Sequence, residues 1–233
     1  MKEKETGTWK IWAVTIFLFA IVVAATIRVS TLPVLNFTAK GSKVHIVIDP
    51  GHGGFDPGKV GTMGTLEKDV NLKISLKLRE ILTKSGYTVA MTREKDEALC
   101  GETTGKRKVE DLNARLAVID KEKPELTVSI HQNSYSAGTK GAQVFYYSGS
   151  EEGKRLANVL QETIKEEMGD GNHRVEKAND SYYMLKKSSG PFVIIECGFL
   201  SNPEEEKLLI SEEYQQKMAK AVAEGIEKFL YNE

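Results

Sequence analysis

The sequence predicts an α/β protein built on a single twisted, mostly parallel sheet with helices on both of its faces. Short apolar runs rich in β-branched residues alternate along the chain with longer amphipathic segments, which is the order expected of repeated strand–helix units. Several of these runs end directly in a turn that carries a polar side chain, as strands that present ligands at their carboxyl ends do. The chain of 233 residues has room for one such domain and a short additional segment.

The amino-terminal segment, residues 1–28, predicts a signal anchor or a signal peptide. Residues 11–27 carry no charge, lysines precede them and Arg28 follows, so the lysines would hold the amino terminus inside and send the rest outside. The apolar run is short for a membrane helix of roughly 20 residues and long for a signal-peptide core of about 7–15. The sequence has no clear small-residue cleavage site, which favours an uncleaved anchor. Residues 29–42 would be a linker, and the globular part that follows would lie on the extracytoplasmic face of the membrane.

The first predicted strand covers residues 44–48, where apolar β-branched residues run together. Pro50 and the glycine after it end this strand, because proline lacks an amide hydrogen and glycine tolerates positive φ. Apolar residues then recur at helical spacing over residues 70–82, which predicts a helix packed on the sheet. Gly86 would end that helix, and residues 88–92 would form the next strand.

Residues 93–108 are polar and without periodicity, so the sequence predicts a loop there. Residues 109–121 follow as a helix whose leucine and isoleucine residues share one side, and Pro124 ends that region. Apolar strands are then expected at residues 126–130 and 143–147.

The last third of the chain continues the alternation of strands and helices. Residues 151–168 predict a charged amphipathic helix, and residues 182–185 a short strand. Residues 192–195 form the most apolar strand of the domain, and a helix is expected over residues 204–230, with a break near Ser211.

Composition excludes some classes of function. The formal net charge is −1 and the sequence pI about 6.5, so no basic face for nucleic acid is expected. The two cysteines, Cys100 and Cys197, are too few for a disulfide framework. Cys197 lies in an apolar run, which favours a buried free thiol, although a disulfide between the two stays open for a domain outside the cell.

Four side chains are expected to meet at one edge of the sheet. His52, His131 and Glu196 each follow a predicted strand, and Glu67 opens a predicted helix. Parallel strands bring their carboxyl ends to a common edge, and two imidazoles with one carboxylate are the donor set of a catalytic zinc site. A second carboxylate beside such a site is the base that a metal hydrolase needs.

Each of these residues also has a simpler interpretation. A single histidine at a strand end is more often a hydrogen-bonded loop residue, and Glu67 could be an acid favoured by the helix dipole. Glu196 is harder to explain in this way, because a carboxylate that follows four apolar residues is costly when it is buried without a partner. Asp49 and Asp56 flank His52 and are either partners that orient its imidazole or turn residues.

Taken together, the motifs around these residues resemble the zinc-dependent N-acetylmuramoyl-L-alanine amidases of the Amidase_3 family. The resemblance runs in order from about residue 43 to residue 230 and rests on residues 47–54, 67–72, 92–93, 128–133 and 195–202. It implies that residues 43–231 are the catalytic amidase domain, with Zn²⁺ as cofactor and peptidoglycan as substrate. The bond cleaved would be the amide between N-acetylmuramic acid and L-alanine.

The resemblance also implies a role for each candidate residue. His52, Glu67 and His131 would be the zinc ligands and Glu196 the catalytic glutamate. The chain departs from the family's commonest pattern at Gln132, where alanine is usual, and in the longer and more polar segment 93–108.

The short chain, the amino-terminal span and the lack of cell-wall-binding repeats further resemble sporulation-specific members of the family. The implied role is removal of stem peptides in the spore cortex, so that a partner deacetylase can form muramic-δ-lactam, with a consequence for germination. An activating helper protein is also expected, because the domain has only its cleft and its anchor to find the substrate.

Two other functions remain open from the sequence. A zinc peptidase acting on cell-wall peptides is one, although the chain lacks the H-E-x-x-H motif of common metallopeptidases. A membrane-tethered, non-catalytic peptidoglycan-binding or scaffold protein is the other, and retention of all four candidate residues argues against it.

Overall fold

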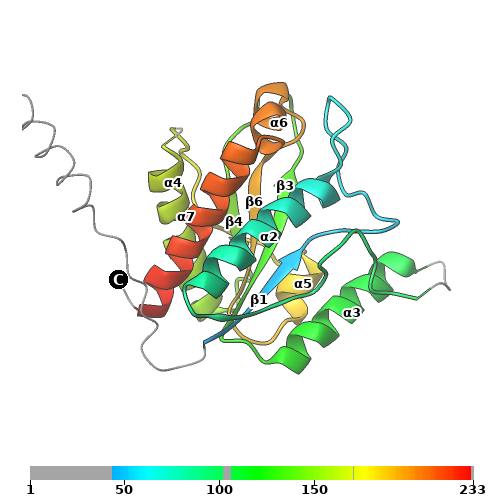
Figure 1. The fold of residues 1–233 in the computed structure, drawn as a ribbon, viewed down its shortest axis with the longest axis vertical. Coiled ribbons are helices and arrows are strands. Elements are labelled where there is room, and N and C mark those ends of the chain that lie inside the picture. Colours follow the sequence, from blue (N-terminus) through cyan, green and yellow to red (C-terminus); the bar gives the residue numbers. More distant parts are fainter. Residues whose placement is uncertain (1–43, 102–105, 170, 232–233) are drawn as a thin grey trace, which may run out of the picture. The chain divides into compact units, whose positions relative to one another are not determined.

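A computed structural model describes residues 44–101, 106–169 and 171–231, which form a six-stranded sheet with helices on both faces (Figure 1). The strand order is β2-β1-β3-β6-β4-β5. All neighbouring strands are parallel except β4 and β6, which are antiparallel, so the sheet is mixed. The strands are β1 (His45–Pro50), β2 (Thr88–Met91), β3 (Leu126–Asn133), β4 (Gln143–Tyr146), β5 (Lys177–Ala178) and β6 (Phe192–Phe199).

Four longer helices and two short ones surround this sheet in the described residues. They are α2 (Glu67–Lys84), α3 (Arg107–Glu122), α4 (Glu151–Met168), α5 (Tyr183–Lys187), α6 (Pro203–Leu209) and α7 (Glu212–Tyr231), of which α5 and α6 are the short ones. Helices α2, α4 and α7 cover one face of the sheet, and α3 and α5 cover the other.

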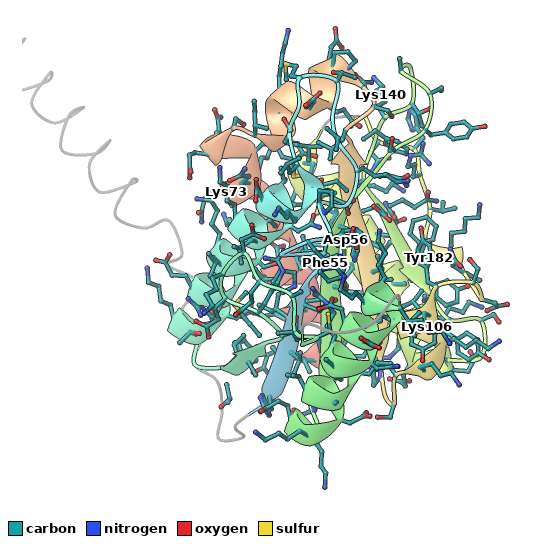
Figure 2. The ribbon with its side chains drawn as sticks, turned by 90° about the vertical axis from the view of Figure 1, so that its right-hand side faces the viewer. Phe55, Asp56, Lys73, Lys106, Lys140 and Tyr182 are labelled. Atoms are coloured by element: carbon teal, nitrogen blue, oxygen red, sulfur yellow. The ribbon has the colours of Figure 1, made fainter. Side chains whose placement is uncertain are left out.

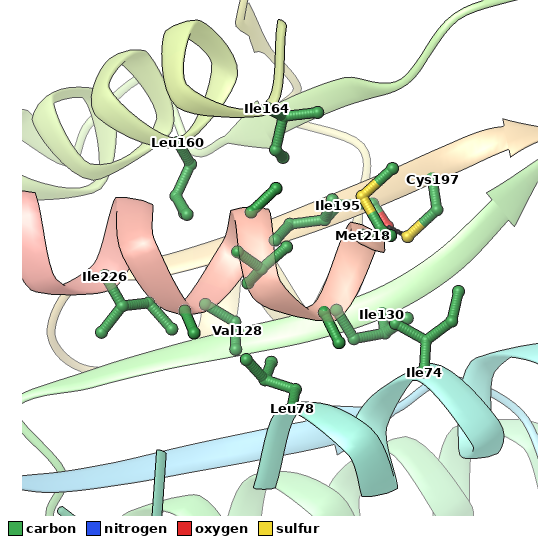
Figure 3. Packing of buried hydrophobic residues seen from close by; sticks show 14 of the residues in the cluster. Ile74, Leu78, Val128, Ile130, Leu160, Ile164, Ile195, Cys197, Met218 and Ile226 are labelled. Atoms are coloured by element: carbon green, nitrogen blue, oxygen red, sulfur yellow. Dashed lines mark hydrogen bonds between the residues drawn. The ribbon is translucent and has the colours of Figure 1, made fainter. Parts of the chain in front are cut away.

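The core lies on both faces of the sheet because the central strands alternate between two apolar clusters. In β1, Ile46 and Ile48 belong to the cluster under α2, α4 and α7, whereas Val47 faces α3 and α5. Side chains from three helices meet the first cluster in Figure 3, where Ile74, Leu78, Leu160, Ile164, Met218 and Ile226 pack over Val128, Ile130 and Ile195. Burial on both faces explains why these strands are continuous apolar runs in the sequence.

The α/β fold, with a mostly parallel sheet between helices, is confirmed, and so is the break near Ser211, which separates α6 from α7. The short strand predicted over residues 182–185 is wrong, because this segment is the start of α5. The Asn179 side chain accepts hydrogen bonds from the amides of Ser181 and Tyr182, a turn that leads the chain into a helix. Strand β5 was not predicted, and its two residues are too few for any periodicity.

The expected signal anchor (residues 1–28) and linker (residues 29–42) lie outside the described residues. Within the described part, no helix combines the length and the apolar character needed to cross a membrane. Both cysteines are free thiols, Cys197 buried and Cys100 partly exposed, which agrees with the buried thiol predicted from the apolar run.

The order of the strands decides where the candidate residues lie. Strands β1, β3 and β6 are adjacent and parallel, so their carboxyl ends share one edge of the sheet. His131 of β3 and Glu196 of β6 are register partners across neighbouring strands. His52 follows the end of β1, and Glu67 is the first residue of α2.

Candidate metal centre and active site

His52, Glu67 and His131 come together at this edge although the chain separates them by many residues. His52 Nε2 lies 3.2 Å and His131 Nδ1 lies 3.0 Å from Glu67 Oε1. The two imidazole rings are 4.9 Å apart at an angle of 75°. One potential ligand atom from each residue lies within 4.8 Å of the others, so the three side chains surround a single point.

The chemistry of this set suits a divalent metal ion. Glu67 is only 2% exposed, and a buried carboxylate is costly unless a positive charge or several donors accompany it. Burial disfavours its ionised form, but the hydrogen bonds from His131 and His52 outweigh burial and hold the pKa of Glu67 well below its usual range. Glu67 is therefore an anion between two imidazoles, which is the donor set of a catalytic zinc site with an open position.

Asp56 fixes the ring of His52. Asp56 Oδ2 lies 2.9 Å from His52 Nδ1, which leaves Nε2 on the side of Glu67, and Lys108 Nζ donates to the other oxygen of Asp56 at 2.9 Å. Burial disfavours charge on His52, but the hydrogen bonds to Asp56 and Glu67 raise the pKa of His52 to about 9. An imidazole must lose this proton to bind a metal, so metal binding at this site depends on pH.

Glu196 lies beside the triad and lines the same cavity of about 290 Å³. Its Oε1 is 3.5 Å from the hydroxyl of Tyr182, and its buried Oε2 has no hydrogen-bond partner among the described residues. Burial raises the pKa of the Glu196 carboxyl to about 7, and the charge of Glu67 adds to this against the opposing effect of the two histidines. A carboxylate with such a pKa can both accept and release a proton near neutral pH.

The rest of the cavity was not predicted from the sequence. Its wall on the side of α3 and α5 is largely apolar, whereas the rim near α2 and β3 is polar. Tyr182, labelled in Figure 2, directly precedes α5 in the segment for which a strand was expected, and its hydroxyl lies 3.5 Å from Glu196 Oε1. The remaining lining residues are Lys59, Leu112, Gln132, Asn133, Ser134, Tyr183, Met184 and Ile194.

Comparison with known proteins agrees with this geometry. The profile of the Amidase_3 family, described as N-acetylmuramoyl-L-alanine amidase, matches residues 46–228. The chain belongs to this family. The amidase is also similar to the germination-specific N-acetylmuramoyl-L-alanine amidase of Bacillus subtilis (strain 168), with 38% identity over 188 residues, which cover 79% of this chain and 78% of the relative.

Solved structures of other amidases share the fold. One is the CwlD amidase from Clostridioides difficile in complex with the GerS lipoprotein, with a TM-score of 0.78 and 42% identity; the match covers 81% of this chain and 99% of that one. Another is the amidase AmiC2 of Nostoc punctiforme, with a TM-score of 0.71 and 36% identity, covering 82% of this chain and 99% of the other. The activity expected from the sequence motifs, that of an N-acetylmuramoyl-L-alanine amidase, is therefore confirmed at the level of the family.

In this amidase Asp49 pairs with residues beneath the site and does not orient the His52 imidazole. It forms no described hydrogen bond with His52; its carboxylate accepts hydrogen bonds from Thr92 Oγ1 (2.6 Å), Ser129 Oγ (2.6 Å) and Arg115 Nη1 (2.8 Å). Burial opposes its ionisation, but Arg115 and the two hydroxyls lower the pKa of Asp49 to about 2. Asp49 points into the protein under the site and is paired there.

Two buried arginines hold the backbone that leads to His52. Arg115 donates to the carbonyl oxygens of Pro50 and His52, and Arg93 donates to those of Pro50 and Gly51. Three successive carbonyl groups are thereby satisfied without water. Arg93 stands in the motif at residues 92–93 on which the family resemblance rests, but the sequence analysis did not single out Arg115. Asp49, at the end of a buried strand, demands a positive partner without saying which one.

Proposed function

We propose that this amidase uses a zinc ion held by His52, Glu67 and His131 to hydrolyse the amide between N-acetylmuramic acid and L-alanine in peptidoglycan. The observation that carries the proposal is that these three side chains surround one point while Glu196 lines the same cavity. Two imidazoles and a carboxylate leave a coordination position for water or substrate, as catalytic zinc sites do.

Zinc bound there supplies Lewis acidity, which polarises the amide carbonyl and lowers the pKa of water. Glu196 takes the proton from the attacking water and returns it to the leaving amine of alanine. An amine leaves poorly unless it is protonated, so one carboxyl group with a pKa of about 7 serves both steps. The hydroxyl of Tyr182, 3.5 Å from Glu196 Oε1, holds this carboxyl group toward the cavity.

Digestion of purified sacculi by the full-length protein tests the reaction. We expect intact stem peptides with a free amino-terminal alanine in mass spectra, loss of activity with a chelator, and recovery with Zn²⁺. Cleavage between two amino acids of the stem would make the protein a zinc peptidase instead. Binding to sacculi without cleavage, even after an extract of sporulating cells is added, would make it a non-catalytic scaffold; the proximity of the four reactive side chains argues against that outcome.

We further propose that the amidase acts outside the cell membrane, in the spore cortex, where removal of stem peptides allows a deacetylase to form muramic-δ-lactam. Support comes from the similarity to a germination-specific amidase of Bacillus subtilis and to CwlD. The uncharged residues 11–27 would export or anchor the chain. Muropeptide analysis of spores should show the lactam in the wild type and its loss when Glu196 is replaced by Gln; lactam at the wild-type level would refute the cortex role.

The similarity to CwlD also suggests that the activity depends on a helper protein. The structure of the Clostridioides difficile relative is a complex with the GerS lipoprotein, and we propose a helper of this kind for the present chain. Turnover of the purified protein should then be low and should rise when an extract of sporulating cells is added. Full activity of the pure protein would refute helper dependence.

A further inference from the structure

We propose that Asn71 is a positioning residue for the metal site, because its buried amide joins the three chain segments that carry the ligands. The inference rests on the proposed metal site and adds a residue that does not touch the ion. Asn71 lies in α2, four positions after Glu67, and its side chain is fully buried. Residues four apart in a helix share a face, so Asn71 sits directly behind the carboxylate.

The donor side of the Asn71 amide contacts two of the three segments. Its Nδ2 donates to Glu67 Oε1 at 3.3 Å and to the carbonyl oxygen of Gly51 at 3.1 Å. Gly51 directly precedes His52. One NH₂ group therefore links the Glu67 carboxylate of α2 to the backbone of Gly51, the residue before His52.

The acceptor side of the same amide contacts the third segment. Gln132 Nε2 donates to Asn71 Oδ1 at 3.1 Å, and Gln132 directly follows His131 in β3. The backbone amide of Gln132 also donates to Glu67 Oε1, at 3.1 Å. Gln132 is 2% exposed, so this contact lies in a dry part of the site.

These hydrogen bonds of Asn71 should strengthen metal binding. A buried amide whose donor and acceptor sides are both satisfied has one favourable orientation, since rotating it would leave polar groups unpaired. It therefore restricts how Glu67 can turn and how far the segments of His52 and His131 can separate. Groups that orient metal ligands in this way change metal affinity by about 10- to 100-fold when they are removed.

Zinc affinity, rather than activity, is the measurement that tests this role. We would titrate the full-length protein against a chromophoric chelator and follow metal-free thermal unfolding by circular dichroism. Asn71→Ala should fold and lose affinity by about 10- to 100-fold. Gln132→Ala, which removes the acceptor-side contact of Asn71 and leaves its donor-side contacts in place, should lose less. Ser75→Ala is the matched control, because Ser75 is buried in the same helix with a hydroxyl that has no described partner, and its zinc affinity should equal that of the wild type.

Several outcomes would overturn the inference. A folded Asn71→Ala protein with wild-type zinc affinity would show that Asn71 serves only stability, even if its unfolding temperature fell. If Asn71→Ala does not fold, the zinc affinity of Gln132→Ala is the deciding measurement. A lowered zinc affinity would support a positioning role for Asn71, and an unchanged one would refute it. Wild-type protein that binds no zinc would refute the proposed metal site itself, which is a different result.

Discussion

Gly51→Ala should abolish tight metal binding without changing the fold. A Cβ at this position would lie 2.2 Å from Nε2, 2.3 Å from Cε1 and 2.7 Å from Cδ2 of the His131 ring. Ordinary contact begins near 3.4 Å, so the ring or the backbone must move by at least about 1.2 Å, the difference between 3.4 and 2.2 Å. Metal–ligand distances tolerate about 0.2 Å. We therefore expect zinc affinity to fall by at least about 100-fold, or roughly 3 kcal/mol.

Chelator competition on the full-length variant would measure this loss, with circular dichroism to establish that the variant is folded. Gly51 does not have positive φ, so alanine is compatible with its backbone. Gly138→Ala is the control, because Gly138 also lacks positive φ and its added Cβ would meet nothing within 4 Å. A Gly51→Ala protein with wild-type zinc affinity would show that the His131 ring does not lie over Gly51, and the ligand geometry would be wrong.

Three further predictions concern neighbouring residues. Glu196→Gln should keep its zinc and lose about 10²- to 10⁴-fold in kcat on purified sacculi; retained turnover would exclude the proton-transfer role. Tyr182→Phe removes the hydroxyl beside Glu196 and should lower kcat roughly tenfold in the same assay. An unchanged kcat would show that this hydrogen bond does not contribute to catalysis. Asp49, whose pKa is lowered from 3.8 to about 2, contributes roughly 2 kcal/mol above pH 4 that is lost as the pH falls toward 2. Urea unfolding of Asp49→Asn should therefore show lower stability at pH 7, by about 3–5 kcal/mol, because Arg115 loses its buried partner. Its decline between pH 5 and 2 should also be shallower than in the wild type, and an equally steep decline would contradict the pairing.

The convergence of the four candidate residues could be predicted because it depends on a simple rule. His52, His131 and Glu196 follow apolar runs, and the carboxyl ends of parallel strands share one edge. The order of the apolar segments along the chain, and the polar residue that follows each of them, was enough for this prediction. The helix that Glu67 opens returns from the same edge, which brings its first residue to the site.

The partners of Asp49 and the segment that carries Tyr182 could not be predicted in this way. Arg115 lies 66 residues after Asp49, and its pairing depends on how α3 packs on β1. Tyr182 directly precedes a helix of five residues, which is too short for helical periodicity to distinguish it from a strand. Such contacts come from tertiary packing, so the wall of the cavity was less predictable than its reactive groups.

The backbone at His52 has a consequence for how an ion would enter the site. His52 has φ of 60°, in the left-handed region that costs a residue other than glycine about 1–2 kcal/mol. Arg93 and Arg115, anchored below the loop, offset this cost by fixing the carbonyl groups around it. The imidazole is thus presented before any cation arrives, and little ordering of the chain is left to oppose capture of the ion.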